Sequence, residues 1–335
     1  MSSLALATAL RAVADACAVT RAVQARLGLI KAMTKDDRSP VTVADYAAQA
    51  IVSLRLADAF GPFAMIGEES AAALRDAAGS ELATAVGDAV RSVCPGVSDA
   101  AVLDAIDCGS HRPDGRAASR TYWTLDPVDG TKGFLRGGQY AVSLALIEDG
   151  QVTLGVLGCP NLGADHARSF DEPDPVGLLF HARLGDGAHA LPANAPTGTA
   201  RRIGVAQDRA IRDMRVCESV ESGHSRQDFT SRIVAHLQAR GAPARLDSQT
   251  KYAVVARGQA DAYLRLPTSS TYVEKIWDHA AGKIVAEEAG ARVTDIDDKP
   301  LDFTHGATLA HNRGVVCAPP ALHRALIDAI AQLMP

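Results

Sequence analysis

Two aspartates close together in the nonapeptide W-T-L-D-P-V-D-G-T, residues 123–131, carry the strongest chemical signal in this sequence. Asp126 and Asp129 follow an apolar run that predicts a strand, and Pro127 should end that strand because proline fixes φ and donates no hydrogen bond. Gly130 then lets the chain turn sharply. Two carboxylates held this close repel each other and take up protons unless a cation lies between them, which suits a hard divalent ion such as Mg²⁺.

The residues after this turn, 131–135, predict the start of a helix. Free backbone N–H groups at Gly130 and Thr131 would then face the same space and could hold a phosphate oxygen. An ordinary Asp-Pro turn explains the first aspartate and the proline, but not the second aspartate, the glycine and the threonine together. The nonapeptide therefore predicts a site for a divalent cation with room for a phosphate group.

Three other acids stand at comparable places in the sequence: Asp45 near a helix start, Glu68 after a short strand, and Asp278 beside Trp277. Each has an ordinary explanation on its own. Acids are favoured in the first turn of a helix by the macrodipole, and aspartate is a common N-cap. The hypothesis of a metal site rests on the whole set, together with Asp126 and Asp129.

Composition limits the classes of protein that this chain can belong to. With 335 residues, 47% hydrophobic and 22% charged, it has the composition of a globular protein with one large domain or two halves. The net charge of -5 provides no basic field to attract a nucleic acid polymer or an anionic membrane. We therefore expect a small-molecule substrate, and an anionic one would need local positive charge. We expect a monomer, although the sequence leaves the oligomeric state open.

Cysteine usage and the N-terminal sequence favour a cytoplasmic location. The six cysteines are scattered without a C-x-x-C pair and are interpreted as reduced core residues: Cys17, Cys94, Cys108, Cys159, Cys217 and Cys317. No uninterrupted apolar run approaches the roughly 20 residues of a membrane span. The alanine-rich start with several arginines leaves an organellar transit peptide open.

The elements that must position these acids follow from hydrophobic periodicity and turn residues. In the first half we expect long helices over the N-terminal region and over 42–60, a strand at 63–66, and hairpins at 141–157, around Asp149-Gly150, and at 178–191. Residues 71–119 are interpreted as an inserted helical flap, and 192–199 as a linker. From 214 onward strand and helix patterns alternate, which favours a sheet covered by helices.

Seven blocks of sequence resemble a known superfamily. S-P-V-T-V-A-D-Y (39–46), I-G-E-E-S (66–70), L-D-P-V-D-G-T-K-G-F-L-R-G (125–137) and E-K-I-W-D-H-A-A-G (274–282) resemble, in order and spacing, the lithium-sensitive, magnesium-dependent phosphatases related to inositol monophosphatase and fructose bisphosphatase. V-C-E-S-V-E-S-G-H-S (216–225), L-D-S-Q-T-K-Y (246–252) and A-Y-L-R-L-P (262–267) resemble the 3'(2'),5'-bisphosphate nucleotidases within it.

The resemblance implies a fold and a metal site. The fold would be a layered αβαβα sandwich, with an N-terminal half (1–198), a C-terminal half (199–335) and the site in the cleft between them. One Mg²⁺ would be bound by Glu68, Asp126 and the backbone carbonyl of Val128, and a second by Asp126, Asp129 and Asp278, with two or three ions in all.

The resemblance also implies catalytic and substrate-binding residues. Asp45 and Thr131 would orient and deprotonate the attacking water. The nucleotide would contact Gly130, Thr131, His224, Ser248, Lys251, Arg265 and Asp278. Lys251 and Arg265 would supply the local positive charge that the overall composition lacks.

The activity implied by these blocks is removal of the 3'-phosphate from adenosine 3',5'-bisphosphate, which gives AMP and phosphate, with 3'-phosphoadenylyl sulfate as a second candidate substrate. An inositol mono- or polyphosphate phosphatase would use the same metal loop and remains the enzyme alternative. A non-catalytic nucleotide sensor is the alternative from another class. It predicts loss of a metal ligand or of Thr131, and the sequence retains all of them.

Overall fold

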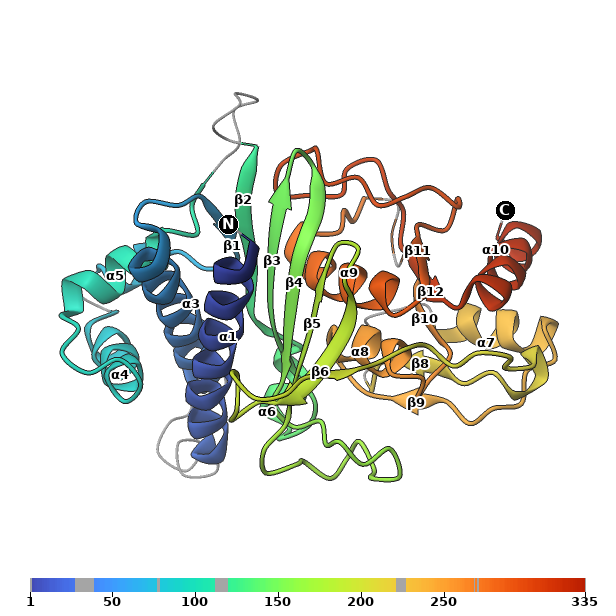
Figure 1. The fold of residues 1–335 in the computed structure, drawn as a ribbon, viewed down its shortest axis with the longest axis horizontal. Helices are drawn as coiled ribbons and strands as arrows, with labels where there is room; N and C mark the ends of the chain where they lie inside the picture. The colour runs from blue at the N-terminus through green and yellow to red at the C-terminus, as the bar shows by residue number, and fades with distance from the viewer. Residues whose placement is uncertain are drawn as a thin grey trace.

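Helices and sheets alternate in five layers across the molecule, in the order helix, sheet, helix, sheet, helix (Figure 1). This computed structural model describes residues 2–27, 39–76, 79–111, 120–220, 227–267, 269 and 271–334. The layered αβαβα architecture expected from the sequence is confirmed.

The first sheet contains seven strands within the described residues, in the order of the sequence. They are β1 (Met65–Gly67), β2 (Thr121–Asp129), β3 (Ala141–Glu148), β4 (Gln151–Cys159), β5 (Leu178–Arg183), β6 (Gly187–Pro192) and β7 (Arg201–Arg202). β1 runs parallel to β2, and all the other neighbours are antiparallel. Both predicted hairpins are confirmed. Asp149 and Gly150 have φ of 50° and 78°, as a two-residue type I′ turn requires.

The prediction that Pro127 ends its strand is wrong by two residues. β2 continues to Asp129. Its pairing with β3 shifts register between Asp126 and Asp129, while its parallel pairing with β1 ends at Leu125. The proline therefore sits in an irregular stretch where no ladder partner needs its missing N–H. This irregularity leaves both aspartates at the same end of the sheet.

Two long helices, α1 (Ser2–Ala25) and α3 (Ser39–Phe60), cover one face of this sheet. Alanine is the commonest of their buried residues and allows the backbones to approach closely. By length and composition alone, Ser3–Ala25 passes as a membrane-spanning helix, although Arg11, Asp15 and Arg21 interrupt its apolar residues. However, 56% of that window is buried against the rest of the chain, as in the core helix of a folded domain.

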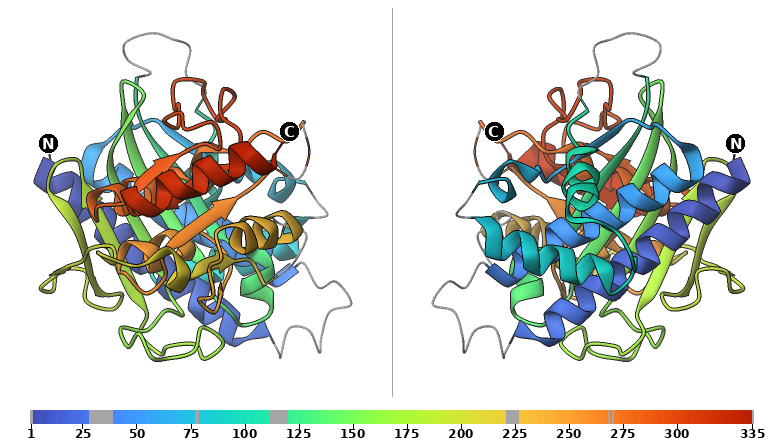
Figure 2. Two further views of the ribbon diagram at one scale, coloured as in Figure 1. Left: turned by 90° about the vertical axis from the view of Figure 1, so that its right-hand side faces the viewer. Right: turned by 90° about the vertical axis from the view of Figure 1, so that its left-hand side faces the viewer.

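The segment interpreted as a flap is helical where the structure describes it. It contains a 3₁₀ turn, η1 (Ala71–Leu74), and two helices, α4 (Ser80–Arg91) and α5 (Asp99–Asp107). Buried side chains of these elements, including Val86 and Ile106, share a hydrophobic cluster with Ile51 of α3. Figure 2 shows this group on the outer side of α3. The helices therefore form part of the first helical layer.

The opposite face of the first sheet is covered by α8 (Thr250–Ala256) and α9 (Ala280–Glu288), preceded by the 3₁₀ turn η6 (Ile276–Asp278). Because helices cover both faces, nearly all residues of β3 are buried, and buried and exposed residues do not alternate along the strand. These central helices also carry Lys251 and border Asp278, so the middle layer connects the site to both sheets.

The second sheet has five strands in the described residues, in the order β11-β12-β10-β8-β9. They are β8 (Val216–Glu218), β9 (Ala244–Arg245), β10 (Ala262–Arg265), β11 (Arg292–Thr294) and β12 (Val315–Ala318). The outer helices α7 (Gln227–His236) and α10 (Pro320–Leu333) cover its far face (Figure 2). The short turn η4 (Ile211–Asp213) precedes β8. Since β7 still belongs to the first sheet, the chain passes to the second sheet after residue 202, slightly beyond the expected boundary at 198/199.

Candidate active site

A cleft of about 620 Å³ lies between residues of the two halves, beside the end of β2. Its walls include α6 (Thr131–Leu135), the turn that precedes α8 and the end of β10. Most of the predicted site residues line it: Glu68, Asp126, Val128, Asp129, Gly130, Thr131, Ser248, Lys251, Arg265 and Asp278. Asp45 is not among the lining residues, and His224 lies outside the described residues.

The two halves meet closely at Gly130. Gly130 has φ of 89°, and a Cβ at this position would lie 2.9 Å from the Cβ of Ser248. Ser248 itself has φ of 69°, and its side chain bonds to Thr250 at the start of α8. Asp129 accepts a hydrogen bond of 2.5 Å from the backbone N–H of Gln249. The aspartate turn of the first half is therefore fixed against the turn before α8.

The acidic wall of the cleft is built from carboxyl groups whose pKa values are raised. Burial raises the pKa of Asp126 well above its usual range, and the charges of Glu68 and Asp129 add to this. Burial, with repulsion from Glu69 and Asp129, raises the pKa of Glu68 to about 7. Burial also raises the pKa of Asp129, although the Gln249 N–H opposes the rise. Without a cation, each of these carboxyls therefore holds its proton to a higher pH than an ordinary carboxyl does.

Two further acids belong to the same electrostatic group. Burial raises the pKa of Asp278 to about 6 in spite of the opposing charge of Arg265. Burial, together with the charges of Glu69 and Glu68, raises the pKa of Asp45 well above its usual range. Asp45 therefore lies on α3 within electrostatic reach of the acidic wall.

The acidic wall fits hard divalent cations. Its donors are carboxylate oxygens from Glu68, Asp126, Asp129 and Asp278, with the backbone carbonyl of Val128 beside them. Mg²⁺ prefers oxygen ligands, and a bound cation would favour the ionised form of these carboxyls, which burial and neighbouring negative charges disfavour. The Val128 N–H donates to Asp126 at 3.1 Å and fixes that carboxylate within the turn.

The opposite wall carries two cations that already have partners. Lys251 is 5% exposed, and its Nζ lies 3.3 Å from both the Ser219 hydroxyl and the Leu246 carbonyl. Burial lowers its pKa. The guanidinium of Arg265 contacts Glu274 at 2.8 Å and Asp278 at 3.3 Å. One arginine therefore joins the cationic wall to the acidic wall through Asp278.

Sequence reasoning missed a buried chain of polar side chains behind Arg265. The Tyr252 hydroxyl bonds to His279 Nδ1 at 2.9 Å, and His279 Nε2 lies 3.2 Å from Glu274, which in turn holds Arg265. Glu274, Asp278 and His279 place one ligand atom each within 4.8 Å of one another, but Glu274 is held by the Arg265 guanidinium and His279 by the Tyr252 hydroxyl. Glu274 and His279 both belong to the block 274–282, so their closeness in sequence to Asp278 was the feature that could have indicated them as site residues.

The expected contribution of the helix that follows the aspartate turn is smaller than predicted. α6 has only five residues, so it has little of the macrodipole that a longer helix would direct at an anion. Thr131 is its first residue and is exposed to the cleft. The start of α6 therefore offers only a weak field to an anion in the cleft.

Residues 3–334 match the inositol monophosphatase family. The chain belongs to this family. A 3'(2'),5'-bisphosphate nucleotidase of Emericella nidulans is 41% identical to it over 323 residues, which cover 90% of each chain. The enzyme of the same name from Oryza sativa is 40% identical, over 98% of this chain and 94% of the rice protein.

Solved structures in this family share its fold. An inositol monophosphatase from Anabaena superposes with a TM-score of 0.61 at 22% identity, over 98% of this chain and 96% of that one. CysQ from Bacteroides thetaiotaomicron, described as a bacterial member of the family, gives a TM-score of 0.61 at 19% identity, over 95% and 98%. At these identities the structural likeness establishes the family fold alone.

Proposed function

We propose that this chain is a metal-dependent phosphatase that removes the 3'-phosphate of adenosine 3',5'-bisphosphate to give AMP and phosphate, with 3'-phosphoadenylyl sulfate as a second substrate. The observation that carries this proposal is one cleft with a wall of carboxylates facing a wall that holds Lys251 and Arg265. The names and close similarity of the nucleotidase relatives over nearly the full length support it.

The size of the barrier favours metal ions over side-chain acid/base catalysis alone. Hydrolysis of phosphate monoesters needs accelerations of up to about 10²¹, whereas a general acid or base contributes typically about 10² to 10⁴. Two or three Mg²⁺ ions, held by Glu68, Asp126, Asp129, Asp278 and the Val128 carbonyl, would supply positive charge to the phosphate and make water a stronger nucleophile.

The side chains of the chain then have separate tasks. Asp45, whose pKa is raised by burial, is a stronger base than an ordinary aspartate and would accept a proton from the attacking water. Thr131, exposed in the cleft, would orient that water through its hydroxyl. Attack in line would expel the 3'-oxygen of the nucleotide without a covalent enzyme intermediate.

The second phosphate of the substrate is the group that the cationic wall would recognise. Arg265 can bind phosphate oxygens through two nitrogens, and Lys251 acts as a buried point charge. Ser248, at the turn against Gly130, would hydrogen-bond the nucleotide. We also assign His224, from block 216–225, to the nucleotide. An inositol monophosphate has no second phosphate for this wall, so the wall favours the bisphosphate over the inositol alternative.

Phosphate release with Mg²⁺ present tests this assignment. The expected result is a higher kcat/KM for adenosine 3',5'-bisphosphate than for inositol 1-phosphate or for adenosine 3'-monophosphate. A preference for inositol phosphate would overturn the substrate. Tight binding of the nucleotide without turnover would instead support the non-catalytic sensor.

A further inference from the structure

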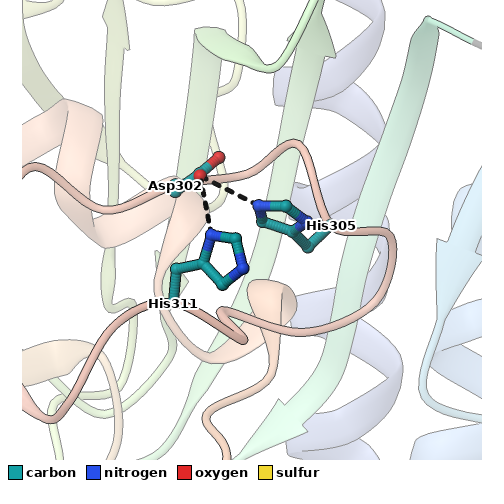
Figure 3. Close-up of side chains that lie close together, drawn as sticks. All are labelled: Asp302, His305 and His311. Carbon is teal, nitrogen blue, oxygen red and sulfur yellow. Dashed lines mark hydrogen bonds and ion pairs between the residues drawn. The ribbon is translucent and has the colours of Figure 1, made fainter.

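A group of metal-binding side chain types lies outside the cleft, on the loop between β11 and β12. Asp302, His305 and His311 each offer one ligand atom, and these atoms lie within 4.8 Å of one another. Figure 3 shows the three side chains pointing toward a common point. We propose that they form a binding site for a transition-metal dication with affinity for imidazole, such as Zn²⁺, which fastens this loop.

The spacing of the ligand atoms suits one ion with only small side-chain rotations. Asp302 Oδ2 lies 3.1 Å from His305 Nε2 and 3.8 Å from His311 Nδ1 (Figure 3). Zinc binds such ligands at about 2.0 to 2.2 Å, so two ligands of one ion lie roughly 3 to 4 Å apart. The centroids of the imidazole rings are 3.8 Å apart, which brings both rings to the same carboxylate oxygen.

The carboxylate is oriented as a metal ligand usually is. Its other oxygen, Oδ1, accepts hydrogen bonds from the Thr304 N–H at 2.9 Å and the Thr304 hydroxyl at 2.6 Å. The backbone N–H of Asp302 donates to Asn312 Oδ1 at 2.7 Å. Outer hydrogen bonds of this kind fix ligand orientation in metal sites and contribute to affinity. Oδ2 is thereby left directed at the two histidines.

The donor set selects a different ion from that of the cleft. Two imidazole nitrogens and one carboxylate oxygen suit Zn²⁺, Co²⁺ or Ni²⁺, whereas Mg²⁺ prefers oxygen ligands alone. The His311 side chain is 66% exposed, so an ion here would be reached from solvent and would keep water in its remaining positions. Excess Mg²⁺ should therefore not displace it.

The loop connects the cluster to the active site through its backbone. The Phe303 carbonyl accepts from the Tyr122 hydroxyl of β2 at 3.1 Å. The Leu309 N–H donates to the Glu274 carbonyl at 2.9 Å, and the Ala307 carbonyl accepts from the Ile276 N–H at 3.2 Å. An ion that fixes this loop therefore also restrains residues 274–276, the segment that leads into Asp278.

Zinc titration calorimetry of the full chain, with excess Mg²⁺ occupying the cleft, tests the site. The expected result is one zinc ion per chain that the double variant His305→Asn/His311→Asn no longer binds. Thr304→Val, which removes only the hydroxyl bond to Asp302, should weaken binding by about 10- to 100-fold. A matched control is His166→Asn/His236→Asn, which removes two exposed histidines elsewhere and should leave zinc binding unchanged.

A second measurement addresses the loop. Amide hydrogen exchange at Ile276 and Leu309 should slow on zinc addition in the wild type and not in the His305/His311 double variant, whose fold is checked by an unchanged thermal unfolding midpoint in Mg²⁺ alone. Equal zinc binding by the wild type and this variant, displacement of zinc by Mg²⁺, or no binding at all would overturn the proposal. Zinc binding without slower exchange would overturn the fastening of the loop.

Discussion

The two walls of the cleft differ in whether their charges are already balanced by the protein. On the acidic wall, burial raises the pKa values of Glu68, Asp126 and Asp129, and the charge of Asp129 adds to the rise at the other two. On the cationic wall, Lys251 has a hydroxyl and a carbonyl as partners, and Arg265 has Glu274 and Asp278. The comparison teaches that the first wall gathers buried carboxyls with raised pKa values, which supports the proposal that it binds cations. The side chains of the second wall are already held in place by their partners, which supports the proposal that this wall binds the second phosphate.

The largest effect should follow from removing charge on the acidic wall. Asp126→Asn keeps the shape of the side chain but removes a negative ligand, so kcat for the bisphosphate should fall by at least about 10³-fold, as for loss of a major electrostatic group. Phosphate release across a Mg²⁺ titration measures this. Asp149→Asn, in the exposed turn between β3 and β4, is the matched control and should retain full activity.

The same pair of variants tests the charge imbalance by stability. Mg²⁺ at about 100 times its Kd should stabilise the wild type by about 2.7 kcal/mol, and Asp126→Asn should lose most of this increment. Thermal unfolding with and without Mg²⁺ measures it. If the variant gained as much stability from Mg²⁺ as the wild type, the first wall would not be the metal site.

The cationic wall should govern substrate selection more than turnover. Lys251→Met keeps the apolar stem but removes the charge, and loss of a charged hydrogen bond to phosphate should lower kcat/KM for the bisphosphate by about 10- to 100-fold. The loss should be much smaller for adenosine 3'-monophosphate, which lacks the second phosphate. An equal loss for both substrates would place Lys251 in the fold or in catalysis, and would break the division between the walls.

A smaller effect should come from the residue that orders the cationic wall from behind. Glu274 contacts both Arg265 and His279. Burial alone would raise the pKa of Glu274, but these two partners outweigh it, so the pKa lies below its usual value. Glu274→Gln keeps hydrogen bonding without the charge, and kcat/KM should fall by about 10-fold, mainly through KM. Tyr252→Phe, at the other end of this chain of side chains, should change KM less. A fall in kcat at constant KM would assign Glu274 to the acidic wall instead.

The sequence predicted the acidic wall better than the cationic one, for a physical reason. Asp126, Gly130 and Thr131 lie in one short turn, where proline, glycine and repelling carboxylates constrain the backbone locally. The layers and hairpins could likewise be predicted, because periodicity and the Asp149-Gly150 turn are local signals. The resemblance, and not residue chemistry, pointed to Lys251 and Arg265.

What could not be predicted depends on contacts between distant segments. The end of β2 was misplaced because the lost hydrogen bond at Pro127 is harmless only where both neighbouring strands have stopped pairing regularly. Residues 71–119 were interpreted as an insertion because the sequence does not show that their apolar side chains pack against α3. No role was predicted for Glu274, because its contact with Arg265 on β10 joins residues from different elements.

The smallest predicted effect concerns the pH dependence of stability, which should have opposite signs for the acidic wall and for a buried histidine of the first sheet. The folded-state pKa of Glu68 is raised to about 7, so its contribution to stability increases as pH falls through that value toward its unfolded pKa. His181 on β5 behaves in the opposite way. Burial, with the neighbouring His189 ring stacked 5.2 Å away, lowers its pKa to about 4.

Between pH 6.5 and about pH 4 the unfolded chain takes up a proton at His181 that the folded chain refuses, so stability falls as pH falls through this window. Between about pH 7 and about pH 5 the wild type should therefore lose about 1 to 2 kcal/mol relative to His181→Gln. Urea unfolding at both pH values measures the difference, and the exposed His236→Gln serves as control. If His181→Gln showed the same pH dependence as the wild type, the acid-induced loss of stability would not originate at His181, and the carboxylates of the cleft could not account for it because their predicted sign is the reverse.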